Sequence, residues 1–376
     1  MDFDSDGGSG SSLLSGALIS TRDGTLGAAD YQATPIDQIK PAHIKNREEG
    51  YKARFFRLSG EQRSVVAVAD LMQVFSFDVS YVNEDMGHSL VTLLCECTEA
   101  GAHQPIVAKP LMRIRRPSNE YLSKAAKLVD NYVDLRDERN VEINIQIEDI
   151  LSFFGMVTPL HGTSYRWTLE LLDVAMDVAS ALVQSVKLDL GCPRPELFSP
   201  SLQPIIQTPS HGTFPSGHST QAFTVASLLY CLRFASKNPD MDNEFCVSED
   251  ETRLMKIANR IAVNRTVAGV HFPVDSAAGA MLGITLGRTL YRIATGAPDM
   301  VQGRNFDAAQ YMLAGQDGLS DQPRDFNLLE LSELMKAEGP ASATPEDMAE
   351  QIAPRTSMIL KLLWEKADEE WKGRWG

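Results

Sequence analysis

The feature that most constrains the fold is a pair of long segments composed almost entirely of apolar and small residues. Residues 219–235 are apolar nearly all the way around a helix, and residues 273–294 combine apolar residues with many alanines and glycines. A helix without a polar face has to be covered by other elements. Proline at the first helical turn costs nothing, because the N–H that it lacks would have no partner there. We expect the first segment to be a central, buried helix and the second to pack closely on its neighbours.

Other segments repeat apolar residues every three or four positions, as amphipathic helices do. Residues 118–139 do so from Tyr121 to Tyr132, with Ser118 placed as an N-cap. Further helices are predicted over residues 141–154, 163–187, 249–265, 326–336 and 356–371. The last carries Trp364 and Trp371 and could pack on the bundle or on another subunit, with core packing preferred. The predicted fold class is mainly α, a helical bundle.

A small β-containing region is expected near the N-terminus. Residues 74–82 alternate apolar and polar side chains, as a half-buried strand does, and residues 89–97 and 105–110 could pair with them. The expected organisation is a flexible N-terminal arm (1–50), a β-containing region (51–117), a helical catalytic domain (118–300) and a helical C-terminal region (301–376). A linker at residues 338–345, rich in proline and alanine, divides the C-terminal region.

The charge and cysteine content exclude several classes of partner. The net charge of −15 disfavours nucleic acid and anionic membrane surfaces. No apolar run has the length of a membrane span, and the acidic start lacks the basic residues of a signal peptide, so we expect a cytoplasmic protein. Five scattered cysteines indicate reduced thiols, and Cys95 and Cys97 lack the partner pair of a zinc site. The basic cluster Arg113, Arg115 and Arg116 is interpreted as solvated surface.

Three stretches near the expected helix ends carry the residues that suit chemistry. They are Lys187 with Arg194-Pro195 seven positions on, Pro215-Ser216-Gly217-His218, and Arg265 followed by His271 and Asp275. Two guanidinium forks and an ammonium group suit the oxygens of a tetrahedral or trigonal-bipyramidal oxyanion. The free N–H groups at a helix N-terminus favour an anion, and glycine lets the backbone approach it. We predict that one helix bundle brings these residues into a single pocket.

In this order, the three motifs resemble the signature shared by type-2 phosphatidic acid phosphatases, bacterial class A acid phosphatases and vanadium-dependent haloperoxidases. The resemblance extends from Lys187 to Asp275 and implies a bundle of the haloperoxidase and acid phosphatase type. Asn264 departs from it, because the family pattern usually has serine just before the arginine. That departure concerns the support of Arg265 or of its loop.

The resemblance also implies a role for each residue. Phosphate or vanadate oxygens would be bound by Lys187, Arg194, Ser216, the Gly217 N–H and Arg265. His271 would be the axial group, forming a phosphohistidine in a phosphatase or ligating vanadium in a haloperoxidase. Asp275 would orient His271, and His218 would be the acid/base on the opposite side.

The choice between the two chemistries depends on features outside the shared motifs. His211, seven residues before His218, resembles bromide-specific haloperoxidases, in which histidine lines the halide side; the alternative is an ordinary loop histidine. Lipid phosphatases of the superfamily are membrane proteins, and class A acid phosphatases are exported and shorter. The short gap between His218 and Arg265, however, is closer to that of phosphatases.

These features favour a vanadate-dependent haloperoxidase that uses hydrogen peroxide to oxidise bromide or iodide and so halogenates a small organic acceptor. The alternative is a soluble phosphatase that hydrolyses phosphate monoesters without a cofactor. A third hypothesis is a non-catalytic anion-binding protein. A homo-oligomer is compatible with the sequence.

Overall fold

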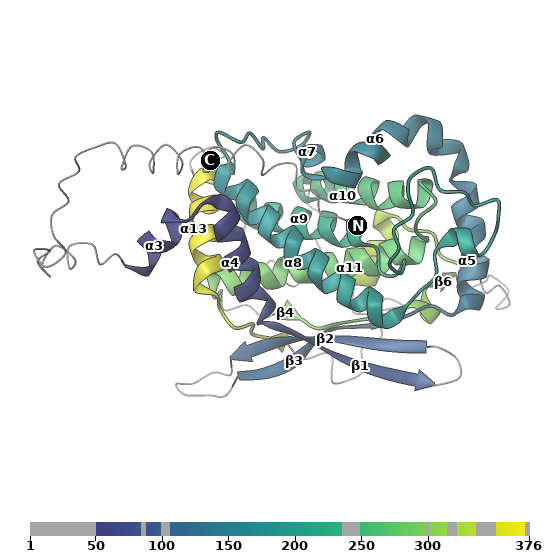
Figure 1. The fold of residues 1–376 in the computed structure, drawn as a ribbon, viewed down its shortest axis with the longest axis horizontal. Coiled ribbons are helices and arrows are strands. Elements are labelled where there is room, and N and C mark those ends of the chain that lie inside the picture. Colours follow the sequence, from purple (N-terminus) through teal and green to yellow (C-terminus); the bar gives the residue numbers. More distant parts are fainter. Residues whose placement is uncertain are drawn as a thin grey trace, which may run out of the picture. The chain divides into compact units, whose positions relative to one another are not determined.

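The two apolar segments form helices α9 (Gly217–Phe234) and α11 (Pro273–Thr295), which lie against each other in the computed structural model (Figure 1). Three glycines one helical turn apart on α11, Gly279, Gly283 and Gly287, face α9. A Cβ atom at Gly283 would lie 2.4 Å from the Thr220 carbonyl oxygen, well inside van der Waals contact. Glycine therefore sets the close approach of the two helices, as the composition predicted.

Helix α9 occupies the centre of the bundle. It contacts α8 (Arg166–Leu190), α10 (Glu249–Val267), α11 and α13 (Met358–Trp371). On α13, Trp364 and Trp371 are buried, and Trp371 Nε1 donates to Thr168 Oγ1 of α8 over 3.0 Å. This confirms core packing for the C-terminal helix. Helix α12 (Leu328–Met335) contacts α10 and α11.

The predicted boundaries between residues 118 and 154 were wrong. Helix α5 (Asn119–Asn131), capped by Ser118 as expected, gives way to a 3-10 turn, η2 (Val133–Leu135). Helices α6 (Arg136–Glu148) and α7 (Leu151–Phe154) follow. The buried side chains of α5 end at Val129, so the turn starts where the helix no longer has an inward face. As a result α6 points Ile143 and Gln146 inward and contacts α10.

The predicted sheet is present and has one more strand than expected. Strands β1 (Phe75–Asn83), β2 (His88–Thr98) and β3 (Ile106–Arg115) pair antiparallel, and β5 (Arg304–Asp307) pairs parallel with β3. The strand order is therefore β1-β2-β3-β5. The sheet packs on the bundle, because β2 contacts α8 while β3 and β5 contact α11 (Figure 1).

Two helices that were not predicted precede the sheet. These are α3 (Tyr51–Arg57) and α4 (Gly60–Met72). Ser59 and Gln62 form a capping box at the start of α4, each side chain accepting from the other's backbone N–H. A serine followed three positions later by glutamine is a helix-start signal. The start of α4 could therefore have been predicted from Ser59 and Gln62 alone.

Short elements complete the described chain. They are η3 (Pro195–Leu197), β4 (Val301–Gln302) paired with β8 (Gln351–Ile352), η4 (Ala308–Gln310), and β6 (Met312–Leu313) paired with β7 (Gln322–Pro323). The structure describes residues 50–83, 88–98, 106–234, 249–297, 301–313, 322–335 and 351–372. The predicted arm up to residue 49, the linker 338–345 and Cys246 lie outside these ranges. Residues Met1–Arg54 and Phe55–Gly376 form separate compact units.

The basic cluster at the end of β3 is not simply solvated, contrary to the prediction. Arg116 Nη1 donates to the Leu190 carbonyl oxygen over 3.0 Å, and Arg115 Nε lies 3.7 Å from an Asp307 carboxylate oxygen. Leu190 is the last residue of α8, where carbonyl groups lack intrahelical partners. Arg116 therefore ties the sheet to the end of α8 that carries Lys187.

Candidate active site

The candidate residues come from four helix ends that meet at one end of the bundle. Lys187 lies in the last turn of α8, which ends at Gly191 with a left-handed backbone (φ 55°). Gly217 opens α9, Arg265 lies in the last turn of α10, and Asp275 lies in the first turn of α11. The loops that leave these ends supply the remaining candidates.

Lys187 and Arg194 are buried and bonded mainly to backbone carbonyl groups. Lys187 Nζ donates to the carbonyl oxygens of Gly212 (3.0 Å) and Thr213 (3.3 Å). Arg194 Nη1 donates to the Val270 carbonyl oxygen over 2.7 Å. Burial, followed by the charge of Arg194, lowers the pKa of Lys187 to about 7. The ammonium group is therefore held in place without a counter-charge beside it.

Arg265 has unused hydrogen-bond donors. Its Nη2 donates to the Ile143 carbonyl oxygen and to Gln146 Oε1, each over 3.0 Å. Its Nε and Nη1 are buried without a partner, although buried guanidinium donors are normally paired. Burial lowers the pKa of Arg265 to about 10. Within the described ranges, none of the three cations forms an ion pair with a carboxylate, so their combined charge is available to an anion.

The start of α9 forms another side of this region. Ser216 is buried, its Oγ accepts from the Ser219 N–H at 3.4 Å, and its own N–H donates to the Asp275 carbonyl oxygen at 2.9 Å. The first N–H groups of a helix lack intrahelical partners and favour negative charge. A Cβ at Gly217 would meet no protein atom closer than Val183 Cγ1 at 3.9 Å. The glycine is thus not required by packing within the protein, which agrees with a backbone that faces a ligand.

His271 is held through Nδ1. Its Nδ1 lies 3.0 Å from Asp275 Oδ2, which also accepts from the Phe272 N–H (2.9 Å) and from Thr213 Oγ1 (2.5 Å). A carboxylate beside Nδ1 assigns the ring proton to that atom and leaves a lone pair on Nε2, which lies 3.3 Å from Arg194 Nη1.

The local charges keep this ring neutral. Burial, followed by the charges of Arg194 and Lys187, lowers the pKa of His271 well below its ordinary value. Burial raises the pKa of Asp275 to about 6, against the hydrogen bonds from Thr213 and Phe272. Above that pH, Asp275 is mainly ionised and His271 Nε2 is an unprotonated nucleophile or ligand.

Sequence reasoning assigned no role to Thr213. Its hydroxyl lies 3.0 Å from His271 Nδ1 and donates to Asp275, so it supports both members of the pair. The residue stands in the stretch that the motifs identify, but its partners are 58 and 62 positions away. Only the packing of α11 beside this loop could reveal the contact.

His218 is held through Nε2, which lies 2.9 Å from the Gln146 carbonyl oxygen. A carbonyl oxygen only accepts, so Nε2 carries the proton and Nδ1 is left as the acceptor of the neutral ring. Burial, followed by the charge of Arg265, lowers the pKa of His218 to about 3. Gln146 was absent from the predicted site, and it also contacts Arg265 and Asn264.

His211 lies in the loop before α9, beside the first two cations. Its Nδ1 is 3.2 Å from Arg194 Nη2 and 3.4 Å from Lys187 Nζ. The ring is half-buried, and burial followed by the charge of Lys187 lowers its pKa. The structure therefore brings together all the residues proposed from the motifs, with His211 next to Lys187 and Arg194.

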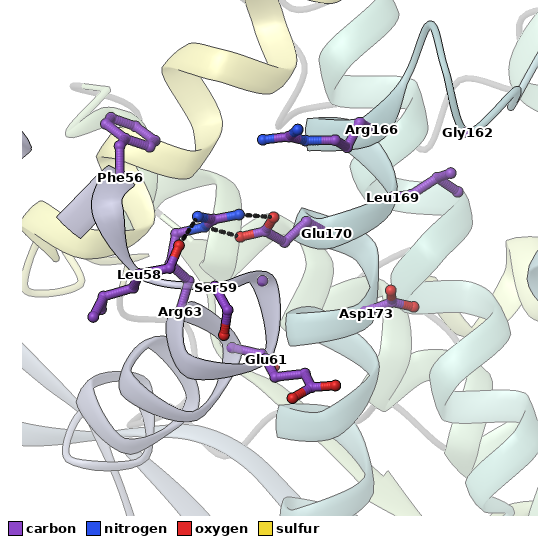
Figure 2. Close-up of a pocket in the computed structure, with 12 residues that line it drawn as sticks. Phe56, Leu58, Ser59, Glu61, Arg63, Gly162, Arg166, Leu169, Glu170 and Asp173 are labelled. Atoms are coloured by element: carbon purple, nitrogen blue, oxygen red, sulfur yellow. Dashed lines mark hydrogen bonds and ion pairs between the residues drawn. The ribbon is translucent and has the colours of Figure 1, made fainter. Parts of the chain in front are cut away.

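A cavity of about 730 Å³ lies elsewhere, between the start of α4 and the first half of α8 (Figure 2). Arg63 lies in it, donating to the Leu58 carbonyl oxygen and forming two bonds of 2.6 and 2.7 Å with the Glu170 carboxylate. None of the motif residues lines this cavity. Glu170 is 17 positions before Lys187, roughly 26 Å along the helix. The Arg63–Glu170 pair joins α4 to α8 and is separate from the candidate site.

A profile of the PAP2 superfamily matches residues 171–298. These residues form a PAP2 superfamily domain. The match contains Lys187, Asp275 and every motif residue between them. Among solved structures, the chain is similar to the first transmembrane PAP2-type phosphatidylglycerolphosphate phosphatase from Bacillus subtilis. The identity is 19% and the TM-score 0.34, over 46% of this chain and 84% of that one.

No curated protein sequence matches the chain. Within the described part of the protein, no helix has both the length and the apolar character needed to cross a membrane.

Proposed function

We propose that the PAP2 superfamily domain is an enzyme whose site binds a tetrahedral oxyanion, with His271 Nε2 as the group that would attack or ligate its central atom. The observation that carries this proposal is the state of Arg265, whose Nε and Nη1 are buried without a partner. Leaving a buried charged donor unpaired is costly. An anion with several oxygens would satisfy these donors, and it would compensate the charges of Lys187 and Arg194 as well.

The first candidate activity is a vanadate-dependent haloperoxidase. The residues fit vanadate, because Arg265 has unpaired buried donors for its oxygens and the neutral His271 ring, with its proton on Nδ1, offers Nε2 as a ligand in place of its present contact with Arg194 Nη1. His271 would ligate the metal, and Lys187, Arg194, Ser216, Gly217 and Arg265 would bind its oxygens. Bound vanadate would supply Lewis-acid activation of hydrogen peroxide.

His211 is the observation that favours this candidate. A half-buried imidazole that contacts both Lys187 and Arg194 would line the approach of a halide to the bound oxyanion. The net reaction takes one halide ion, one hydrogen peroxide and one proton to hypohalous acid and water. His218, with Nδ1 as an acceptor, would take up a peroxide proton and return it. The hypohalous acid would halogenate a small organic acceptor.

The second candidate is hydrolysis of phosphate monoesters, and the contact between His271 and Asp275 favours it. Attack of His271 Nε2 on phosphorus forms a P–N bond, breaks the bond to the ester oxygen and leaves positive charge on the ring. An ionised Asp275 at 3.0 Å from Nδ1 stabilises that charge. A protonated His218 would give its proton to the leaving oxygen. It would then accept one from the water that hydrolyses the phosphohistidine.

One set of assays separates the candidates. Anion-free protein is tested, with and without orthovanadate, for peroxide-dependent bromination of an organic acceptor and for hydrolysis of an aryl phosphate. Bromination that requires vanadate supports the first candidate. Hydrolysis without vanadate, inhibited when vanadate is added, refutes it and supports the second. Oxyanion binding with neither activity leaves the non-catalytic hypothesis.

Variants test the residue roles. His271→Ala should abolish either activity, while His161→Ala, which changes an exposed histidine outside the motifs, should not. His211→Phe should change halide use and leave phosphate hydrolysis nearly unchanged. An unchanged halide profile would return His211 to the role of an ordinary loop histidine.

A further inference from the structure

We propose that Gln146 is a positioning residue of this site: its amide holds Arg265 without neutralising it, and its backbone carbonyl sets the tautomer of His218. The inference rests on the oxyanion site proposed above. Gln146 is fully buried in the last turn of α6, outside the three motifs. Among the residues that the structure describes, it is the one with hydrogen bonds both to Arg265 and to His218.

The carbonyl of Gln146 is available because α6 ends there. Asp149 is extended (φ −135°, ψ 100°), and the last helical bond runs from its N–H to Ile145. The carbonyl of Gln146 is therefore among those that a helix C-terminus leaves without an intrahelical partner. His218 Nε2 occupies it at 2.9 Å, and the negative end of the helix dipole faces the ring.

The hydrogen bond between His218 and the Gln146 carbonyl raises the pKa of His218, whereas the nearby positive charges lower it. The positive groups that act on it are Arg265 on α10, Lys187 on α8 and Arg194 in the following loop, while His271 is nearby and neutral. The bond to the Gln146 carbonyl favours the protonated ring, and the three cations disfavour it. With Nε2–H bound to the carbonyl, only Nδ1 can exchange a proton with a substrate.

A chain of hydrogen bonds fixes the orientation of the Gln146 amide. Arg139 Nη1 can only donate, so the Asn264 atom 2.9 Å away is its oxygen. Asn264 Nδ2 therefore donates, to Glu142 Oε2 and to Gln146 Oε1, each over 3.1 Å. The atom that Gln146 presents to Arg265 is consequently its oxygen. Asn264, which departs from the family pattern, is thus a member of this network.

The acceptor that holds Arg265 is uncharged, and this is the basis of the inference. A glutamate of the same length would hold the guanidinium as well, but it would place a negative charge next to the anion site. At an effective dielectric constant of about 20, such a charge weakens the binding of an anion a few ångströms away by at least about tenfold. Glutamine positions Arg265 without neutralising the guanidinium, whose positive charge can then interact with the bound anion.

The test compares Gln146→Glu with Gln146→Met, using isothermal titration of molybdate, a tetrahedral dianion. We expect the Glu variant to lose at least about tenfold in affinity. The Met variant, which removes the amide without adding a charge and whose lost NH2 group had no partner, should lose less affinity. Gln73→Glu, at the exposed position that follows α4, makes the same charge change as a control and should bind as the wild type does. A Glu variant that binds as tightly as the wild type, or as the Met variant, would overturn the inference.

A second measurement depends neither on a ligand nor on a substitution of Gln146. NMR of the ligand-free protein with ¹⁵N-labelled histidine, assigned by loss of the signal in His218→Ala, reports the tautomer. The Gln146 carbonyl requires protonated Nε2 and bare Nδ1, and the opposite tautomer would refute its role. Wild-type protein that binds no oxyanion would refute the proposed function, while the tautomer still decides the role of Gln146.

Discussion

Lys187→Met should make the ligand-free protein more stable while removing its affinity for oxyanions. Burial, followed by the charge of Arg194, lowers the pKa of Lys187 from 10.5 to about 7. At about 1.4 kcal/mol per pKa unit, holding this side chain in the folded protein costs roughly 5 kcal/mol at pH 7. The proposed binding of an anion at this site would offset such a cost.

The substitution also removes the two hydrogen bonds from Lys187 to backbone carbonyl groups, and their loss reduces the net gain in stability. The Gly212 carbonyl keeps a second contact, to Arg194 Nη2 at 3.4 Å, whereas the Thr213 carbonyl loses the lysine. An unsatisfied carbonyl costs about 1–3 kcal/mol. We therefore expect Lys187→Met to raise the free energy of unfolding by about 2–4 kcal/mol at pH 7.

The most specific test is the pH dependence of the stability difference between Lys187→Met and the wild type. Because the folded pKa lies below the unfolded one, the unfolded state binds more protons between about pH 7 and pH 10.5, and wild-type stability rises with pH there. The advantage of the variant should accordingly be full at pH 7 and shrink toward pH 10.5. Urea unfolding in phosphate-free buffer measures it, with the exposed Lys361→Met as a control expected within about 0.5 kcal/mol of wild type.

Two results would refute this reasoning. One is a variant less stable than the wild type at pH 7, and the other is a difference that does not change with pH. Molybdate at about 100 times its Kd should stabilise the wild type by about 2.7 kcal/mol and leave the variant unchanged.

Three further predictions follow from the same contacts. Molybdate affinity should fall by up to about tenfold per pH unit above pH 7, because binding then requires Lys187 to take up a proton; titration in buffers of different ionisation enthalpy counts that proton. Thr213→Val, which removes the hydroxyl between His271 and Asp275, should lower kcat by about 10–100-fold, with a much smaller change in molybdate Kd. Gly283→Ala should lower the free energy of unfolding by about 1–3 kcal/mol because its Cβ would meet Thr220, whereas Gly162→Ala, with open space around it, should not.

The elements predicted correctly are those whose signal is local. Helices α8, α9, α10, α11 and α13 follow from the apolar content or periodicity of each segment, and β1 follows from alternation, with β2 expected as its partner. The capping box at Ser59 and Gln62 was also local, and recognising it would have placed α4. Strand β5 had no comparable signal, because four residues become a strand only when β3 offers them an edge.

The residues of the site likewise fall into those that local sequence identifies and those that only the structure reveals. The motif residues could be identified from the sequence by itself, because their types and spacing indicate a site for an oxyanion, and a helix places Lys187 or Asp275 near an end without help from the rest of the chain. Only the tertiary structure decided that Gln146 and Thr213 hold these residues. Gln146 is 119 positions from Arg265, and Thr213 is 62 from Asp275. Contacts over such distances depend on how α6 and α11 pack, and neither residue differs locally from an ordinary helix glutamine or loop threonine. The sequence was sufficient to identify the charged residues of the site. Only the packing of the helices showed which uncharged groups hold those residues without neutralising their charge.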